Sequence, residues 1–166
     1  MSNHTPLREQ PLPSGFQRLM MRCPLVLYKL GLGTLLGKRF LKLTHTGRIS
    51  GLLHDTVLEV VTIDDDTGKY YIASGWGEKS NWYKNILVNH RVRVQVGSLY
   101  FDADTRKLPP GEAGEIIFDY AVTHRGAFKM LTERIVGETL EPTHDNARKM
   151  SEYVPVFSLT PTPDNR

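Results

Sequence analysis

Apolar and polar residues alternate most clearly over residues 91–96, where a valine occupies every second position. This period of two is typical of a β-strand with one buried face. The pair Gly97-Ser98 then fits a two-residue hairpin turn into a further strand. A run of β-branched residues before the acidic turn 64–68 indicates another hairpin. The predicted strands span residues 40–44, 57–63, 69–74, 91–96, 99–107 and 154–159.

Helical spacing of apolar residues occupies much of the remaining chain. The predicted helices span residues 15–38, 81–88, 112–124, 127–136 and 144–152. Pro24 should kink the first of these, because proline lacks the N–H of a helical hydrogen bond. Strands joined mostly by hairpins, with helices inserted, do not follow the regular strand–helix alternation of a parallel sheet. The sequence therefore predicts an α+β fold, a six-stranded and mostly antiparallel barrel with flanking helices.

Length and composition bound the organisation of the chain, which has 166 residues, 40% hydrophobic and 23% charged. The polar residues 1–14 contain three prolines and are expected to form a flexible N-terminal arm, whereas residues 15–166 are expected to form a single domain. No apolar stretch reaches the roughly 18 residues of a membrane span. Because Cys23 is the only cysteine and no signal-peptide pattern opens the chain, we expect a cytoplasmic protein.

Charge and residue spacing limit the function classes. The net charge of +3 favours an anionic partner only weakly. Residues 15–39 mix cations with apolar side chains, so this helix either makes peripheral contact with an anionic membrane or covers the barrel with its basic face in water. Arg91 and Arg93 lie on a strand without an aromatic platform, which argues against nucleic-acid binding. The six histidines lack the spacing of a zinc site, and no nucleophile elbow is present, so we expect neither a metal site nor a hydrolase.

Two segments carry candidate chemistry. Residues 43–51 end a strand in a turn that presents hydroxyls and one arginine, which is suited to an anion such as phosphate. The alternative for this turn is an ordinary solvated hairpin. Residues 73–85 leave a strand through two glycines and enter a helix, whose N-terminus favours negative charge. Trp76 and Trp82 in this segment either border a planar ring or belong to the core.

With both segments in view, the chain resembles the deazaflavin-dependent nitroreductase family, within the split-β-barrel flavin- and deazaflavin-dependent oxidoreductases. The resemblance runs from about residue 41 to residue 96. It is carried by residues 43–48 (LTHTGR), Ser50-Gly51, Ala73-Ser74, Trp82-Tyr83, Asn85, and Asn89 with the valines at 92, 94 and 96.

This resemblance implies a split barrel that binds coenzyme F-420, a deazaflavin with a phosphodiester and an oligoglutamate tail. The reduced cofactor would pass a hydride to an electron-poor small molecule such as an enone, a quinone or a nitro compound. By position, the cofactor-binding residues would be Gly47, Arg48, Ser50, His54, Thr56, Val57, Ser74, Gly75, Trp76, Gly77, Lys79, Trp82, Tyr83 and Asn85. Ser74, Tyr120 and His124 are the candidate catalytic residues, and a homodimer is expected by analogy with other split barrels.

The chain departs from the family pattern at two places beside Arg48. It has Ile49 where the family commonly has a lysine, and Leu53-His54 where the family has Pro-Arg. Fewer cations would meet a polyanionic tail, since imidazole is charged only part of the time near neutral pH. Two alternatives therefore stay open: an FMN-dependent oxidoreductase on the same fold, and a non-enzymatic binder of a lipid-like ligand.

Overall fold

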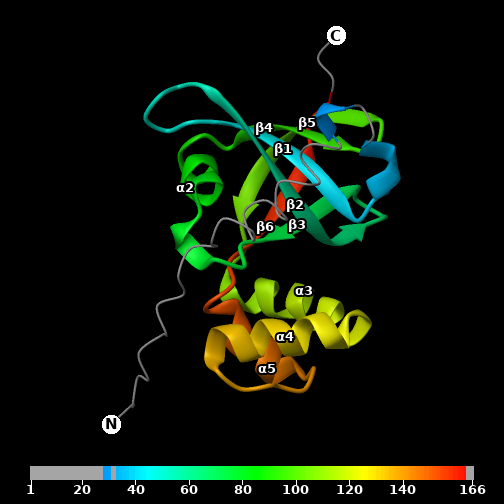
Figure 1. The fold of residues 1–166 in the computed structure, drawn as a ribbon, viewed down its shortest axis with the longest axis vertical. Helices are drawn as coiled ribbons and strands as arrows, with labels where there is room; N and C mark the ends of the chain where they lie inside the picture. The colour runs from blue at the N-terminus through cyan, green and yellow to red at the C-terminus, as the bar shows by residue number, and fades with distance from the viewer. Residues whose placement is uncertain (1–27, 31–32, 164–166) are drawn as a thin grey trace.

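Six antiparallel strands close into a barrel in the computed structural model, which describes residues 28–30 and 33–163 (Figure 1). Around the barrel the strand order is β1-β2-β3-β6-β5-β4, with β4 pairing back to β1. The strands are β1 (Phe40–Thr46), β2 (Leu53–Asp64), β3 (Lys69–Ala73), β4 (Arg91–Val96), β5 (Leu99–Lys107) and β6 (Val156–Pro161). The predicted α+β barrel is therefore confirmed.

The bounds predicted for several elements agree with the structure residue for residue. Both strands of the β4–β5 hairpin and the helix α2 (Asn81–Val88) have the predicted bounds. In contrast, β2 begins at Leu53 rather than at residue 57. Its first residues pair with β1, Leu53 opposite Thr46 and His54 opposite His45, although their side chains are exposed. Only backbone pairing extends β2 in this direction. The sequence therefore shows no alternation of apolar and polar residues that would predict these first positions as strand.

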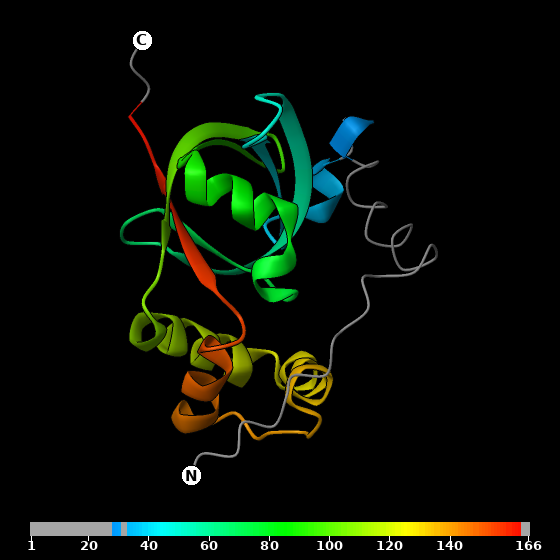
Figure 2. The same cartoon turned by 90° about the vertical axis from the view of Figure 1, so that its left-hand side faces the viewer.

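The barrel interior is one apolar core that α2 completes. Leu41, Leu43, Ile72 and Val94 point inward from the strands and are fully buried. Trp82, Tyr83 and Ile86 come from α2 and belong to the same cluster. The helix lies across one opening of the barrel, as Figure 2 shows. Burial of these large side chains fixes the helix to the barrel, since each contributes roughly 1.5–3 kcal/mol when removed from water.

Three helices between β5 and β6 form a separate layer below the barrel. They are α3 (Pro110–Thr123), α4 (Arg125–Val136) and α5 (His144–Ser151), which match the predicted helices to within a few residues (Figure 1). Phe128 and Met150 are fully buried in their shared core. A Cβ on Gly114 would lie 3.2 Å from Arg148 Cα, so the glycine allows α3 and α5 to pack closely.

Most of the predicted N-terminal region, the arm 1–14 and the helix kinked at Pro24, lies outside the described residues. The end of that predicted helix is a short 3₁₀ helix, η1 (Gly33–Leu36). Tyr28 is buried, and its hydroxyl donates a hydrogen bond to the carbonyl of Phe40 at the start of β1. Among the described residues, no helix has both the length and the apolar character needed to cross a bilayer.

Candidate functional site

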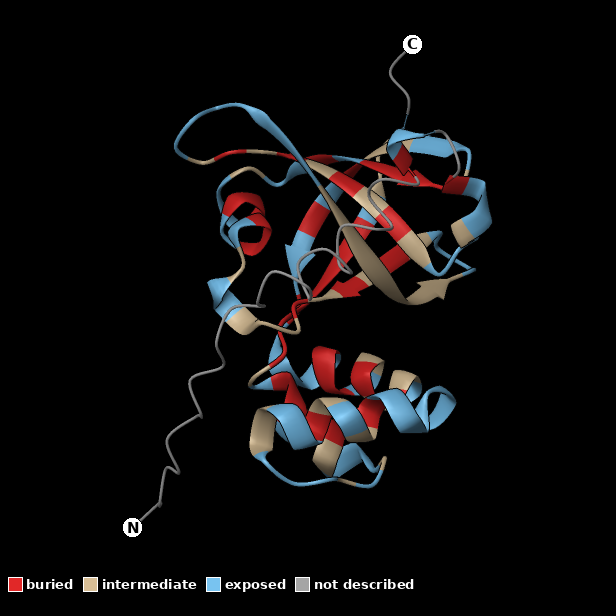
Figure 3. Cartoon of the chain, viewed as in Figure 1, coloured by how far each residue is buried: buried red, intermediate tan, exposed pale blue. Residues whose placement is uncertain are grey.

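A pocket of about 580 Å³ opens between the turn that joins β1 to β2 and the first half of α2. The turn, residues 47–52, is called the Arg48 loop below, and Figure 3 shows it projecting from the barrel with an exposed tip. The pocket is lined by His45, Gly47, Arg48, Ile49, Ser50, His54, Asp55, Thr56, Asn81, Trp82 and Asn85.

The Arg48 loop is closed by its own backbone. Gly47 N–H donates to the Leu52 carbonyl at 2.7 Å, and Gly51 N–H donates to the Gly47 carbonyl at 2.9 Å. Gly51 has a φ of +69°, a conformation that side chains other than glycine rarely adopt. A Cβ on Gly47 would lie 2.6 Å from Ser50 Oγ and 2.9 Å from His54 Nε2. Glycine at position 47 therefore keeps Ser50 and His54 together at the pocket wall.

Asn85 of α2 holds Arg48 at two points. Its Oδ1 accepts a hydrogen bond from the Arg48 backbone N–H at 3.1 Å and another from Arg48 Nη1 at 2.9 Å. The asparagine side chain is 5% exposed, so the anchor is sheltered from water. A guanidinium held in this way loses less conformational freedom when it pairs with an anion. Asn85 thus fixes the position of the Arg48 side chain at the pocket wall.

His45 supports the same anchor from inside the barrel. It is 4% exposed, and its Nδ1 lies 3.1 Å from Asn85 Nδ2. Since Oδ1 already accepts from Arg48, the amide nitrogen donates, and His45 must be neutral with its hydrogen on Nε2. Burial, reinforced by the charge of His54 and opposed by Asp55, lowers the pKa of His45 to about 4. The imidazole therefore remains a hydrogen-bond acceptor at neutral pH.

The second predicted segment forms a loop that is satisfied internally. We call residues 74–80 the Trp76 loop; it includes the short helix η2 (Gly77–Lys79). The Ser74 hydroxyl is buried, donates to the Gly77 carbonyl at 2.6 Å and lies 3.1 Å from Ser80 Oγ. From α4, Arg134 donates to the Gly75 carbonyl at 3.1 Å and stacks over the Trp76 ring at 4.2 Å.

A second contact ties the Trp76 loop to β5. The Tyr83 hydroxyl donates to Glu78 Oε1 at 2.9 Å and accepts from Lys107 Nζ at 2.8 Å. These hydrogen bonds from Tyr83 and Lys107, with the charge of Lys107, hold the pKa of Glu78 below its usual value. Desolvation of the same tyrosine raises its pKa. The cluster therefore acts as a clamp between α2, η2 and the end of β5.

The structure brings half of the predicted cofactor-binding residues to one pocket. Those that line it are Gly47, Arg48, Ser50, His54, Thr56, Trp82 and Asn85. Those that do not line it are Val57, Ser74, Gly75, Trp76, Gly77, Lys79 and Tyr83. For Trp82, both alternatives stated for the tryptophans agree with its position. It packs in the barrel core against Tyr83 and Phe157, and it also borders the pocket.

None of the three candidate catalytic residues lines this pocket. The Ser74 hydroxyl is engaged within its own loop. Tyr120 of α3 stacks on His124, which lies between α3 and α4, with ring centroids 4.7 Å apart. Burial, with the nearby charge of Glu59, raises the pKa of Tyr120, while Arg39 opposes this shift. A catalytic role for any of the three stays a prediction.

Sequence reasoning missed four lining residues: His45, Ile49, Asp55 and Asn81. His45 carried a usable signal, because it continues the inward series of Leu41 and Leu43 at a spacing of two. Asn81 could have been predicted as a lining residue from its position in the first turn of α2. Asp55 lies beyond the strand boundary that the sequence predicted, so its pairing opposite Thr44 was not anticipated.

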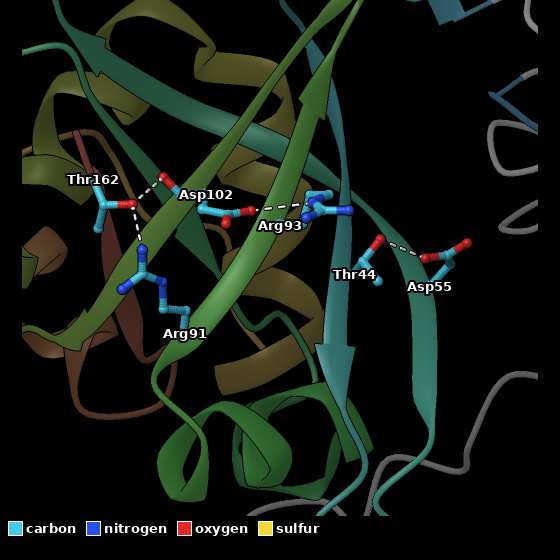
Figure 4. Close-up of polar contacts among 6 residues, drawn as sticks. All are labelled: Thr44, Asp55, Arg91, Arg93, Asp102 and Thr162. Carbon is cyan, nitrogen blue, oxygen red and sulfur yellow. Dashed lines mark hydrogen bonds and ion pairs between the residues drawn. The ribbon is translucent and has the colours of Figure 1, made fainter. Parts of the chain in front are cut away.

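The outer face of β4 shows what the basic alternating strand does. Arg93 pairs with Asp102 at 3.1 Å, and Arg91 donates to the Thr162 hydroxyl at 3.1 Å (Figure 4). On the next strands of the same face, Thr44 donates to Asp55 at 2.6 Å (Figure 4). These residues form a solvated row of contacts between strands. The basic residues of the alternating pattern are therefore paired with other residues of the barrel surface. Within the described residues, no group of three or more histidine, cysteine or acidic side chains is arranged to hold a metal ion.

Known proteins share the sequence pattern and the fold of this chain. The sequence model of one family, F420H(2)-dependent quinone reductase, matches residues 28–137. No curated protein matches the chain. Among solved structures, an F420-H2 dependent reductase, FDR-A, superposes with a TM-score of 0.52 at 23% identity over 74% of this chain and 95% of its own.

Two further structures show the same fold. One, described as a domain-swapped dimer, has a TM-score of 0.54 at 22% identity and covers 88% of this chain and 99% of its own. The other, a protein of unknown function from Agrobacterium tumefaciens, has a TM-score of 0.53 at 13% identity and covers 90% of this chain and 57% of its own. At these identities the likeness concerns the fold alone.

Proposed function

Because the chain belongs to the F420H(2)-dependent quinone reductase family, we propose that it transfers a hydride from reduced coenzyme F-420 to a quinone or to another electron-poor small molecule, such as an enone or a nitro compound. Membership of this family confirms two predictions from the sequence: the protein is an oxidoreductase, and its cofactor is the deazaflavin. The acceptor is the part that we propose.

One observation carries the proposal, the anchored Arg48 at the pocket wall. Asn85 fixes both the backbone and the guanidinium of this arginine, and Ser50 lies beside it on the same loop. A planar guanidinium with a neighbouring hydroxyl matches the oxygens of a phosphodiester. The glycine at position 47 lets Ser50 and His54 approach each other at this wall, and a pocket of about 580 Å³ suits a cofactor-sized ligand. The residues present therefore fit the phosphate of a deazaflavin.

The chain's own contribution is binding, orientation and exclusion of water. Gly47, Arg48 and Ser50 would hold the phosphodiester, and the Trp82 side chain would supply an apolar wall. His45 and Asn85 would keep the arginine in place without carrying charge themselves. When bound, the deazaflavin supplies the hydride, so no side chain has to act as a nucleophile. Single polar substitutions should therefore weaken activity by degrees, rather than abolish it.

Fluorescence titration tests the proposal, because Trp82 borders the pocket. The protein is titrated separately with oxidised F-420 and with FMN. We expect saturable quenching by F-420, and at least tenfold weaker binding after Arg48→Ala, since a charged hydrogen bond contributes about 1.5–3 kcal/mol. Arg91→Ala is the matched control, because it removes the same charge from the outer face of the barrel. We expect this control to bind F-420 as the wild type does.

The other outcomes separate the alternatives. Quenching by FMN alone would replace the deazaflavin with a flavin on the same fold. If neither compound binds and a fatty acid co-purifies in native mass spectrometry, the lipid-binder alternative replaces the enzyme. Unchanged F-420 affinity in a folded Arg48→Ala protein would reject the assignment of Arg48. The domain bounds and the homodimer remain predictions, which limited proteolysis and light scattering would check.

A further inference from the structure

The charges around the pocket are few for a ligand as anionic as coenzyme F-420. Arg48 is the only lysine or arginine among the described residues that line the pocket. Lys79, expected from the sequence to help, is exposed on η2 and is absent from the lining. Asp55, the one acidic residue in the described part of the lining, accepts a hydrogen bond from the Thr44 hydroxyl. The described lining therefore offers one full positive charge, enough to pair with one phosphodiester.

Exposed aliphatic side chains follow Arg48 along its loop and into the start of β2. Ile49 is 88% exposed and belongs to the pocket lining, whereas Leu52 at the end of the loop and Leu53 at the start of β2 are 66% and 72% exposed and lie outside the lining. The part of a ligand that extends past the phosphate along this loop meets the aliphatic side chain of Ile49 first. Carboxylates in such surroundings gain no ion pair and lose some hydration. We call Ile49, Leu52 and Leu53 the apolar rim.

From these two observations we propose that the apolar rim makes this protein indifferent to the oligoglutamate tail, with Ile49 as the residue that determines this specificity. The inference rests on the proposed function, since it concerns how the same pocket binds deazaflavins. The phosphate would set the affinity through Arg48, and added glutamates would extend into water without a partner. A deazaflavin with a short tail would then serve as well as one with a long tail.

Binding measurements along a series of deazaflavins test this proposal without any turnover. The ligands are the riboside without phosphate, the phosphate-bearing form without glutamate, and forms with two and with five or more glutamates. For the wild type we expect a gain of at least tenfold in affinity on adding the phosphate, and less than a twofold change along the tail. Ile49→Lys should bind the long-tailed form at least threefold tighter at low salt, and salt should remove the gain.

A matched control separates a local effect from a change in net charge. Leu99 is also exposed, at 55%, and begins β5 at the end of the barrel near Phe40, away from the Arg48 loop. Leu99→Lys therefore adds the same charge and should leave the tail dependence unchanged. Steadily tighter, salt-sensitive binding of longer tails by the wild type would overturn the proposal while leaving the proposed function intact. Failure of every deazaflavin to bind would overturn both.

Discussion

The Arg48 loop and the Trp76 loop look alike in sequence, since each leaves a strand through glycines and carries a cation and hydroxyls. Their structures differ. Arg48 is held from behind by Asn85, with its loop along an open pocket. In the Trp76 loop the Ser74 hydroxyl, the Gly75 carbonyl and the Trp76 ring are all engaged by protein groups. Glycines and hydroxyls at a strand end are therefore not a sufficient sign of a pocket, because the Arg48 loop lines this one and the Trp76 loop does not.

The difference originates in what packs behind each loop. The Arg48 loop is backed by α2, whose Asn85 reaches it through one amide, while its tip stays exposed (Figure 3). The Trp76 loop is covered by α4 through Arg134 and tied to β5 through Tyr83 and Lys107. One loop is therefore held at its base and open at its tip, and the other is held along its length. Substitutions in each loop test whether this contrast governs stability and binding.

Asn85→Leu should have the largest effect. The substitution removes three hydrogen bonds, two partly buried ones from Arg48 and a buried one to His45, and leaves a buried imidazole nitrogen without its donor. We expect a loss of about 3–5 kcal/mol in the free energy of unfolding, measured by urea denaturation. Lys84→Leu, at the exposed neighbouring position of α2, is the control and should change stability little. Equal losses in the two variants would mean that the Arg48 loop needs no anchor.

Acidification should weaken the same anchor before it affects the Trp76 loop. His45 has a pKa of about 4 in the folded chain and 6.5 when unfolded, so the unfolded chain binds more protons between these values. Stability should therefore fall as the pH drops from 6.5 toward 4, by up to about 3 kcal/mol from this residue alone. Glu78, with its pKa held below 4.5, keeps the clamp of the other loop ionised over most of this range.

Urea denaturation of the wild type and of His45→Gln across this pH range checks the assignment. Glutamine keeps an acceptor for Asn85 but does not titrate, so the difference between the two proteins isolates His45. We expect the wild type to lose stability with acidification more steeply than the variant. Parallel curves would show that His45 is not responsible for the pH dependence.

Local patterns in the sequence predicted the fold far better than they predicted the site. The alternation over residues 91–96 and the turn at Gly97 predicted both strands of the β4–β5 hairpin with the bounds that the structure shows. This succeeded because burial of one strand face follows directly from the sequence. The hydrogen bond between Arg48 and Asn85 joins residues that are 37 positions apart in the sequence. A contact of this kind produces no periodic pattern of residues. The roles within the site follow from tertiary contacts, which a linear pattern does not encode.

The two serines show the same limit at short range. Ser50 and Ser74 were both expected to bind the cofactor, and both follow a strand end. Ser50 lines the pocket, while Ser74 turns inward to the Gly77 carbonyl and is fully buried. The Ser50 hydroxyl accepts from the Leu52 N–H at the exposed pocket wall, whereas the Ser74 hydroxyl donates into the buried side of its own loop. The sequence of the loop itself does not contain that information.

Ser74→Ala should have the smallest of these effects and separates the two loops most directly. Losing the 2.6 Å hydrogen bond leaves the Gly77 carbonyl without the hydroxyl that it accepts from, which costs about 1–2 kcal/mol of stability. Because Ser74 does not line the Arg48 pocket, F-420 affinity should stay within about twofold of the wild type, unlike the tenfold loss in Arg48→Ala. Ser98→Ala, at the exposed β4–β5 turn, is the matched control and should alter neither quantity. A tenfold loss of F-420 affinity in a stable Ser74→Ala protein would place the cofactor against both loops, and the contrast between them would then concern packing and not ligand binding.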